Sequence, residues 1–390
     1  MPVTVKKILK LDIFKSVEGI AGETGLNKII KRVSVIDCPV DEELLDNNIV
    51  VQGDFFISNF FVVKDSVDDM VKMVKFLVQS KSSGICILNQ YIDKLPKEVV
   101  DVANENSYPI FLIDMDIPYA DIIRDIMEVI IQNKEDTINE MKIDNILNLE
   151  KDENQIERIA YEINNNFIEN IATIYIKDFP YDRKNHYFIE DINSIKYYSA
   201  LKYRNGILII LSFDKNNKKH INNQFNSIIK QFRSIHEESI IGISNTYNKL
   251  GKLRNCIIES LVSCNFSEIF NRNIVYYKEL GIYKLLALLT DKVELEEFYN
   301  KIILPLKKYD EKYNSDLLET AIKFIANDGD YKKIANAMFQ HENTIRYRIT
   351  KIKQILDMED KNIEFYSQLY IAIKIHIILT TIKNVEILHK

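Results

Sequence analysis

Apolar residues in the first 130 positions form short runs that alternate with longer amphipathic stretches. Two of these stretches, residues 67–80 and 95–106, repeat their apolar positions at helical spacing. Short apolar runs separated by helices are typical of a parallel sheet that is covered on both faces. The strands predicted in this way are residues 32–37, 54–59, 84–89 and 109–114.

Polar residues stand at the carboxyl ends of three of these predicted strands. Ligands of parallel α/β sheets bind beyond such ends, so Asn59, Asn89 and Asp114 are candidates for a small-molecule site. The alternative is that these residues only complete turns, which is a frequent role of Asn and Asp side chains. The sequence leaves both interpretations open.

Residues 119 to about 170 keep a helical pattern but carry many charges. Ile122, Ile126 and Val129 recur at helical spacing, and the apolar stripe is interrupted at residues 134–137. We therefore expect a helical linker over residues 131–170. This linker could help two copies of the chain to dimerise, or it could pack against a neighbouring domain.

The pattern of residues 171–290 predicts a second α/β domain. A strand over 172–178 precedes a hairpin over 194–213, and Asn205-Gly206 is expected at its tight turn because both residues tolerate positive φ. A helix, a strand and another helix follow, and this order favours a ferredoxin-like α/β sandwich. The last three elements are predicted at residues 221–237, 239–244 and 248–264.

The last ninety residues have helical patterns throughout, which predicts an all-α domain over residues 300–390. Asp330 and Asn343 are suitable caps for its two central helices. Only residues 340–342 separate these two helices, and so short a break suits a helix-turn-helix. The apolar faces are Ile334, Ala335, Met338 and Phe339 on the first helix, and Ile345, Ile349, Ile352 and Leu356 on the second. The helices of this domain are predicted at residues 317–327, 331–339, 343–356 and 368–379.

The second central helix has a polar face with cations on both sides. At about 100° per residue, the side chains opposite the isoleucines are those of Asn343, Tyr347, Thr350 and Gln354. The flanking cations are Arg346 and Lys353 on one side, and Arg348 and Lys351 on the other. Such a face fits a DNA groove, where central side chains reach base edges and cations meet phosphates. The alternative interpretation is an ordinary solvated helix face.

The charge distribution supports the DNA interpretation. The chain has a formal net charge of -6, yet residues 331–353 contain six Lys or Arg residues and one acid. A basic ridge on an acidic protein decides which face meets a polyanion.

Other features of the sequence exclude several functional classes. No run approaches the ~18 apolar residues of a membrane span, and the N-terminus has no secretory pattern, so we expect a cytoplasmic protein. The four scattered cysteines should be reduced and mostly buried, and the six histidines lack ligand spacing. We therefore expect no metal and no cofactor. Because nucleophile-elbow, zincin and Walker A motifs are absent, we also expect no enzymatic activity.

Residues 315–356 resemble the C-terminal helix-turn-helix of PucR-type bacterial transcriptional regulators. Residues 17–39, with QGDFFIS at 52–58, are similar to the N-terminal domain of that family, which is named for purine catabolism. Residues 240–261 and 276–289 resemble the GGDEF-like domain of the same regulators and of the related CdaR type. The H-x-N-T-x-R-Y-R core of the helix-turn-helix is matched by His341, Asn343, Thr344, Arg346, Tyr347 and Arg348.

This resemblance implies a DNA-binding regulator of a catabolic operon, with a metabolite-sensing domain at residues 1–130 and a GGDEF-like domain at 171–290. The expected partners are double-stranded DNA, a small-molecule effector, and a second copy of the chain, because one helix-turn-helix reads only a few base pairs. The residues expected to bind DNA are His341, Asn343, Thr344, Arg346, Tyr347, Arg348, Thr350, Lys351 and Lys353.

Two other functions compete with this interpretation. A nucleotide cyclase is disfavoured because the hairpin at residues 203–208 lacks the acids that would hold Mg²⁺, and an asparagine replaces one glycine of the motif. The GGDEF-like domain is therefore expected to be degenerate. A protein-interaction module would explain the terminal helices, but it does not explain a polar face flanked by cations.

Overall fold

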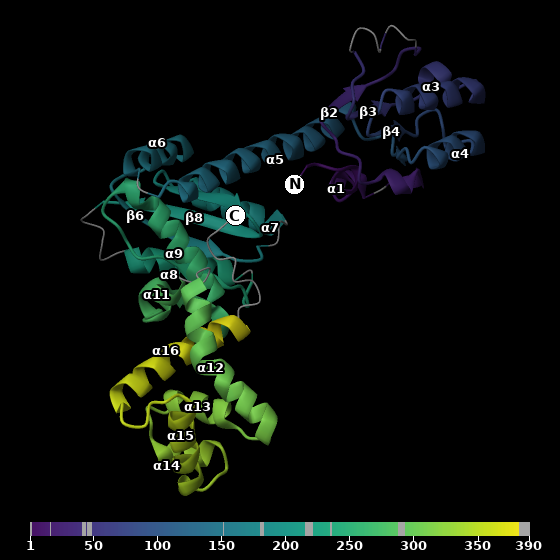
Figure 1. Ribbon diagram of the computed structural model, residues 1–390. Coiled ribbons are helices and arrows are strands. Elements are labelled where there is room, and N and C mark those ends of the chain that lie inside the picture. Colours follow the sequence, from purple (N-terminus) through teal and green to yellow (C-terminus); the bar gives the residue numbers. More distant parts are fainter. Residues whose placement is uncertain are drawn as a thin grey trace. The chain divides into compact units, whose positions relative to one another are not determined.

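The computed structural model describes residues 2–15, 17–40, 44, 49–150, 152–179, 183–214, 221–234, 236–287 and 293–381. The chain forms two compact units, Met1–Asn139 and Glu140–Lys390. Both contain a sheet covered by helices, and the second also contains the C-terminal helices (Figure 1). The protein is thus a mixed α/β chain with a helical C-terminal region.

The first unit is built on a five-stranded sheet with the order β1-β5-β4-β3-β2. The strands β2 to β5 pair in parallel, which confirms the predicted parallel arrangement, whereas β1 pairs antiparallel with β5. The sequence pattern missed β1, a four-residue strand with an irregular register. The strands are β1 (Glu18–Ala21), β2 (Arg32–Val35), β3 (Asp54–Ser58), β4 (Gly84–Leu88) and β5 (Ile110–Ile113).

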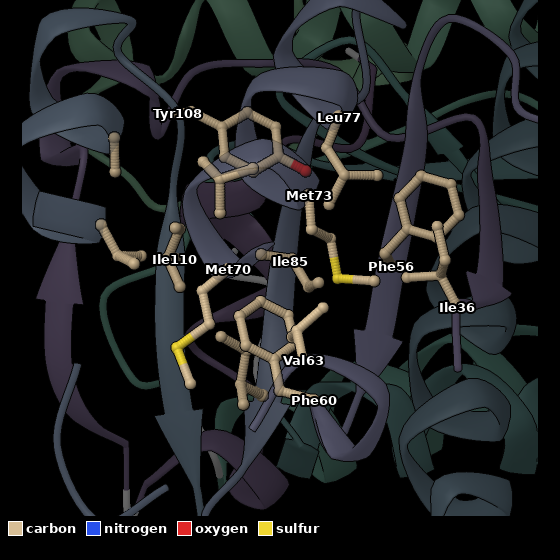
Figure 2. Close-up of a cluster of buried hydrophobic side chains, with 14 of the residues drawn as sticks. Ile36, Phe56, Phe60, Val63, Met70, Met73, Leu77, Ile85, Tyr108 and Ile110 are labelled. Atoms are coloured by element: carbon tan, nitrogen blue, oxygen red, sulfur yellow. The ribbon is translucent and has the colours of Figure 1, made fainter. Parts of the chain in front are cut away.

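Helices cover both faces of this sheet, as the sequence predicted. On one face, α3 (Val67–Gln79) and α4 (Lys97–Glu105) pack on alternate strand residues, and Figure 2 shows Met70, Met73 and Leu77 against Phe56 and Ile85. The other face packs against α1 (Val5–Ile8) and the start of α5 (Tyr119–Asn148). Because successive strand residues point to opposite faces, both sides of the central strands β3 and β4, and of β5, are buried.

The predicted helical linker consists of two helices. α5 is a single 30-residue helix, and α6 (Glu153–Ile163) begins at Asp152, whose side chain accepts a hydrogen bond from the Gln155 N–H at 3.0 Å. Such an N-cap satisfies one of the free N–H groups of the first turn. In the second unit, Ile143 and Ile146 of α5 and Ile156 of α6 are buried in one apolar cluster.

The sheet of the second unit has the order β10-β9-β6-β8-β7. Helices α7 (Arg183–Asn193) and α8 (Ile221–Arg233) cover one face, and α6 and α9 (Leu253–Asn265) cover the other. The order β6-α7-β7-β8-α8-β9 is the strand–helix–strand–strand–helix–strand order of ferredoxin-like motifs. The sequence pattern missed α7 and the edge strand β10. The strands are β6 (Asn170–Ile176), β7 (Tyr198–Tyr203), β8 (Gly206–Phe213), β9 (Ile241–Ile243) and β10 (Ile274–Tyr276).

The hairpin between β7 and β8 is confirmed, but the prediction of its turn residues is wrong by one position. Tyr203 pairs with Gly206, so Arg204 and Asn205 form the loop, and Arg204 has the positive φ of 51°. Gly206 is needed for a different reason. A Cβ at this position would lie 2.3 Å from the carbonyl oxygen of Ile176, so the close approach of β6 requires glycine.

The C-terminal region is helical, as predicted, and its core is one apolar cluster. The last helix, α16, contributes Leu369 and Ile373 to this cluster, while its Ile375 and Ile378 pack in a second cluster with α9 and α11. Because α16 is buried on two sides, it is apolar around most of its circumference. The helices that complete this unit are α10 (Ser267–Phe270), α11 (Tyr283–Ala287), α12 (Val293–Tyr313), α13 (Leu317–Ala326), α14 (Tyr331–Ala337), α15 (Glu342–Ile355) and α16 (Asn362–Thr381).

Candidate nucleic-acid interface

Helices α14 and α15 form the predicted helix-turn-helix, and the chain caps the start of each. The Asp330 carboxylate accepts hydrogen bonds from the N–H groups of Lys332 and Lys333 at 3.0 and 3.1 Å, which confirms it as the cap of α14. The cap of α15 is His341, not Asn343. The Nδ1 atom of His341 accepts from the Asn343 N–H at 3.2 Å, because the helix begins at Glu342, one residue before the predicted start.

The turn between these helices places Phe339 in solvent, so the prediction that it packs with Ile334 and Ala335 is wrong. α14 ends at Ala337, and Phe339 has a φ of 53°, outside the helical region. The backbone N–H of Gln340 closes the turn by donating to the Ala335 carbonyl at 3.0 Å. Ile334 and Ala335 are buried as expected.

One face of α15 anchors it in the domain. Ile345, Ile349 and Ile352 are almost fully buried, and Leu356, the residue just after the helix, is partly buried against the same cluster. Burying an isoleucine side chain contributes about 1.5–3 kcal/mol. The predicted apolar stripe therefore fixes which face of α15 points outward.

The opposite face of α15 is polar and exposed, as predicted. Asn343, Tyr347, Thr350 and Gln354 all lie in solvent, and Tyr347 exposes 69% of its surface. The Thr350 hydroxyl donates to the Arg346 carbonyl at 3.0 Å, one turn earlier. His341 is exposed at the start of this face, and Thr344 is half-buried beside it. The exposed row thus runs along the whole helix.

Arg348 has a structural contact that the sequence did not reveal. Its guanidinium donates to the Asp316 carboxylate at 3.1 Å and to the Thr320 hydroxyl at 3.2 Å, so it connects α15 to the start of α13. Only 17% of its side chain is exposed. A guanidinium held in this way orients the helix, and less of it remains accessible to a partner.

The other three cations of α15 also touch neighbouring elements. Arg346 forms an ion pair with Glu342 at 2.6 Å and lies over the Tyr331 ring at 4.4 Å, yet it remains exposed. Lys351 lies 5.6 Å from the Tyr309 ring of α12. The Lys353 ammonium donates to the Asn362 side chain at the start of α16. Together with the contacts of Arg348, these contacts hold α15 against α12, α13, α14 and α16. They also place its cations beside the polar row.

Acidic residues moderate the positive charge of this surface. Asp316, Asp330 and Glu342 lie within ion-pair distance of Arg348, Lys333 and Arg346 respectively. Asp316 and Asp330 lie outside residues 331–353. The net charge counted over that stretch of sequence therefore overstates the positive charge of the surface. Exposed ion pairs are weak and open readily when a stronger anion approaches.

The three residues predicted for a small-molecule site lie at one edge of the first sheet, after the neighbouring strands β3, β4 and β5. Each also accepts a hydrogen bond from a backbone N–H. The Asn59 side chain accepts from the Phe61 N–H at 3.0 Å, Asn89 accepts from the Met115 N–H at 2.8 Å, and Asp114 accepts from the Asp116 N–H at 3.2 Å. The bonds of Asn59 and Asp114 are local turn bonds, whereas the bond of Asn89 connects the loop after β4 to the loop after β5.

Sequence reasoning missed further polar groups at this edge. Ser58 donates to the Asp37 carboxylate at 2.9 Å, and the backbone N–H of Asn59 approaches the same oxygen at 3.3 Å. Burial, with the nearby Asp37 carboxylate adding to it, raises the pKa of Tyr119 well above its ordinary value. Asp37 ends the predicted strand 32–37, so the rule that identified Asn59 could also have found it.

The described residues offer little support for metal or thiol chemistry. Among them, no group of three or more His, Cys, Asp or Glu side chains could hold a metal ion. Cys86, Cys256 and Cys264 are buried and Cys38 is exposed, and burial raises the thiol pKa of the three buried residues. In the part of the chain that the structure describes, no helix has the length and apolarity to cross a membrane.

Comparison with known families matches both ends of the chain. Residues 7–130 match the "Purine catabolism regulatory protein-like family", and residues 317–375 match the "PucR C-terminal helix-turn-helix domain". The two ends of the chain therefore match the N-terminal domain and the helix-turn-helix domain of PucR-type regulators. The second match includes α13 to α15 and most of α16, so the exposed row of α15 lies within the family's helix-turn-helix domain.

Curated proteins similar to this chain come from Bacillus subtilis (strain 168). The chain is 31% identical over 176 residues to the "Proline-responsive transcriptional activator PutR", covering 43% of this chain and 42% of that protein. It is 28% identical over 142 residues to the "DNA-binding transcriptional activator AdeR", covering 36% and 34%. It is 20% identical over 122 residues to the "Purine catabolism regulatory protein", covering 31% and 22%.

These matches span less than half the length of each relative. A solved structure, the regulator of polyketide synthase expression from Bifidobacterium adolescentis, aligns with 60% of this chain and 96% of its own, at 17% identity. Its TM-score of 0.26 is too low to support a statement about the fold.

Proposed function

We propose that this chain is a DNA-binding transcriptional regulator of a metabolic operon, acting in the cytoplasm without enzymatic activity. The observation that carries the proposal is the exposed polar row of α15, which is backed by buried isoleucines and bordered by Arg346, Lys351 and Lys353. Polar side chains between cations suit base edges between phosphates. The family's helix-turn-helix match and the printed names of the relatives support the same function.

In this proposal the nine residues predicted for DNA binding have different tasks. Asn343 and Tyr347 face base edges, with Thr350 further along the same row, and Arg346 meets a phosphate. His341 and Arg348 act mainly by positioning, because one caps α15 and the other connects it to α13. The remaining three, Thr344, Lys351 and Lys353, contribute to the backbone contacts.

Dimerisation through α5 is part of the proposal, since one helix-turn-helix reads only a few base pairs. Ile131, Ile138 and Met141 are exposed on α5 and follow one another at spacings of seven and three residues. This is the spacing of a coiled-coil seam, and a second copy of the chain would bury it. Ile138→Glu is expected to convert a dimer to a monomer in sedimentation analysis, whereas Thr137→Glu on the same helix is not.

We place the effector at the carboxyl edge of the first sheet, where Asn59, Asn89 and Asp114 lie together with Asp37. Side-chain atoms of these residues that are not used in the turns would contact the ligand. One relative is named as proline-responsive and another as a regulator of purine catabolism. A thermal-shift screen of amino acids and purines on the full chain therefore tests the two most relevant ligand classes.

The middle domain fits the role of a degenerate GGDEF-like scaffold. Its hairpin loop is Arg204-Asn205, so the loop offers no carboxylate for Mg²⁺. The Arg204 N–H of the loop instead donates to the Glu140 carboxylate of α5 at 3.0 Å, and the Tyr203 hydroxyl donates to Asp144 of α5 at 2.8 Å. In this proposal the hairpin anchors the linker helix and does not turn over a nucleotide.

Retention of genomic DNA fragments tests the proposed function. The full chain should retain selected fragments at low and moderate salt, and its affinity should fall steeply as salt rises. Arg346→Ala should weaken retention and reduce the slope of log K against log salt by about 0.9, the value for one lost phosphate contact. The matched control is Arg272→Ala, an exposed arginine of the same unit outside the helix-turn-helix.

The competing function is a protein-interaction module. It predicts no fragment-selective retention, and equal weak retention by the wild type and Arg346→Ala. Fragment selectivity that Arg346→Ala removes and Arg272→Ala preserves would exclude this alternative.

A further inference from the structure

Phe339 occupies an unusual position in the turn of the helix-turn-helix. Its side chain is 95% exposed, and its φ is 53°. The left-handed conformation after a helix is usually taken by Gly or Asn, because a larger side chain costs roughly 1–2 kcal/mol there. An exposed aromatic ring also forgoes the free energy of burial. Two costs therefore coincide at one residue.

The other turns of the same domain avoid this combination. After α13 the left-handed residue is Asp328, and after α15 it is Asp357, with φ values of 52° and 53°. Both are short polar residues that tolerate the conformation. Elsewhere in the described chain, Phe60 also has a positive φ, but its ring is fully buried. An Asp or Asn would thus complete the α14 turn, so the Phe339 ring must serve another purpose.

The surroundings of Phe339 favour nucleic acid over protein as its partner. Its neighbours Asn336, Ala337 and Gln340 are exposed and polar or small. Protein-docking sites need a contiguous apolar patch of a few hundred Å², and a single ring among polar residues does not supply one. Phe339 lies two residues before His341, the N-cap of α15. The start of a recognition helix is the part that approaches base edges.

We propose that Phe339 contacts the 5-methyl group of a thymine in the major groove, beside the bases that Asn343 and Tyr347 face. This inference rests on the proposed DNA binding. The thymine methyl is the apolar feature of the major groove, and phenylalanine is among the side chains that recognise it. Contact with the methyl group would bury the ring and so offset the cost of its exposure.

Uracil substitution tests this contact without altering the hydrogen-bonding groups of the DNA. A duplex is first selected from a random pool with the full chain, and each thymine is then replaced in turn by deoxyuridine, which removes only the methyl group. At one position per half-site, the wild type should lose about fourfold in affinity, the value for one buried methylene.

Phe339→Asn is the matched variant, because asparagine tolerates the left-handed conformation and preserves the turn. It should bind the thymine and deoxyuridine duplexes equally, while its circular dichroism spectrum stays that of the wild type. Phe339→Leu, which keeps an apolar side chain, should retain part of the thymine preference.

Three results would overturn the inference. The first is an undiminished thymine preference in Phe339→Asn, and the second is a wild type that does not respond to any deoxyuridine substitution. The third is an affinity that depends on how easily a base step unstacks and not on the thymine methyl group. That result would make Phe339 a wedge inserted from the minor groove. Failure to select any duplex would instead contradict the proposed DNA binding, and this inference with it.

Discussion

The carboxyl edge of the first sheet and the outer face of α15 carry similar polar residues but use them differently. At the sheet edge, Asn59, Asn89 and Asp114 each accept a hydrogen bond from a nearby backbone N–H. On α15, Asn343 and Tyr347 extend into solvent while the cations beside them make the structural contacts. The comparison teaches that the residue type alone does not reveal a binding surface; the local backbone geometry decides which polar atoms are already used.

The largest expected effect comes from removing the exposed row. Asn343→Ala combined with Tyr347→Ala should lower affinity for a selected duplex by about 100-fold, since each good base contact contributes about 1–3 kcal/mol. Both side chains lie in solvent, so the thermal midpoint should stay unchanged. Titration by fluorescence anisotropy measures the loss. Ile363→Ala, an exposed position on α16, is the control, and an equal loss in that variant would contradict the assignment.

The two arginines of the helix-turn-helix core should differ in role, with Arg346 binding DNA and Arg348 positioning α15. Arg348→Ala removes the contacts with Asp316 and Thr320 and should lower the free energy of unfolding by about 1–2 kcal/mol. Arg346→Ala removes an exposed ion pair with Glu342 and an exposed contact with the Tyr331 ring, so its stability should change by less, about 0.5 kcal/mol. Denaturant unfolding of both variants measures this difference. Equal losses of stability would contradict the division of roles.

At the sheet edge, the expected effect is smaller and concerns stability. Asn89→Ala leaves the Met115 N–H without its acceptor and should cost about 1 kcal/mol of unfolding free energy. Asn89→Asp keeps an acceptor oxygen and should cost less. DNA affinity should change by less than about twofold in both variants, since Asn89 lies in the first unit. A large loss of affinity without effector would show that this edge communicates with the DNA-binding domain even in the free protein.

The smallest expected effect is a pH dependence of the C-terminal region. Partial burial, with the Lys307 charge adding to it, lowers the pKa of His376, whose ring lies 3.1 Å from the Tyr299 hydroxyl. The unfolded chain therefore binds a proton more readily than the folded one as pH falls below about 6.5. The thermal midpoint should drop slightly between pH 7 and pH 5.5, and His376→Gln should reduce this drop. An identical drop in both proteins would contradict the role of His376.

Apolar spacing was enough to predict most of the architecture. The strands β2 to β5 alternate or run apolar over four or five residues, and α15 repeats isoleucine at steps of four and three. Burial decides such positions locally, so the pattern survives in the sequence. The edge strand β1 was missed because Glu18 and Gly19 leave its four residues without an apolar run. Helix α7 was missed because its apolar face is short and interrupted by polar residues.

Polar partners were harder to predict because they depend on residues distant in the sequence. Arg348 lies 32 positions from Asp316, so its ion pair could not be anticipated from the helix itself. His341 and Asn343 compete for the same cap, and one residue of difference in the helix start decides between them. The exposed row of α15 could be predicted because it lies opposite the buried isoleucines. The roles of the cations beside it could be assigned only from their contacts with the neighbouring helices in the structure.

Site-specific photo-cross-linking tests most directly whether the outer face of α15 lies in a DNA groove. A benzophenone amino acid replaces Tyr347 in one protein and Tyr187, an exposed tyrosine of α7, in another. Each is irradiated with a duplex that the wild type has selected. The account predicts a DNA cross-link from position 347 and none from position 187. Equal cross-linking of the DNA from both positions, or cross-linking only from position 187, would contradict the placement of α15 in a groove.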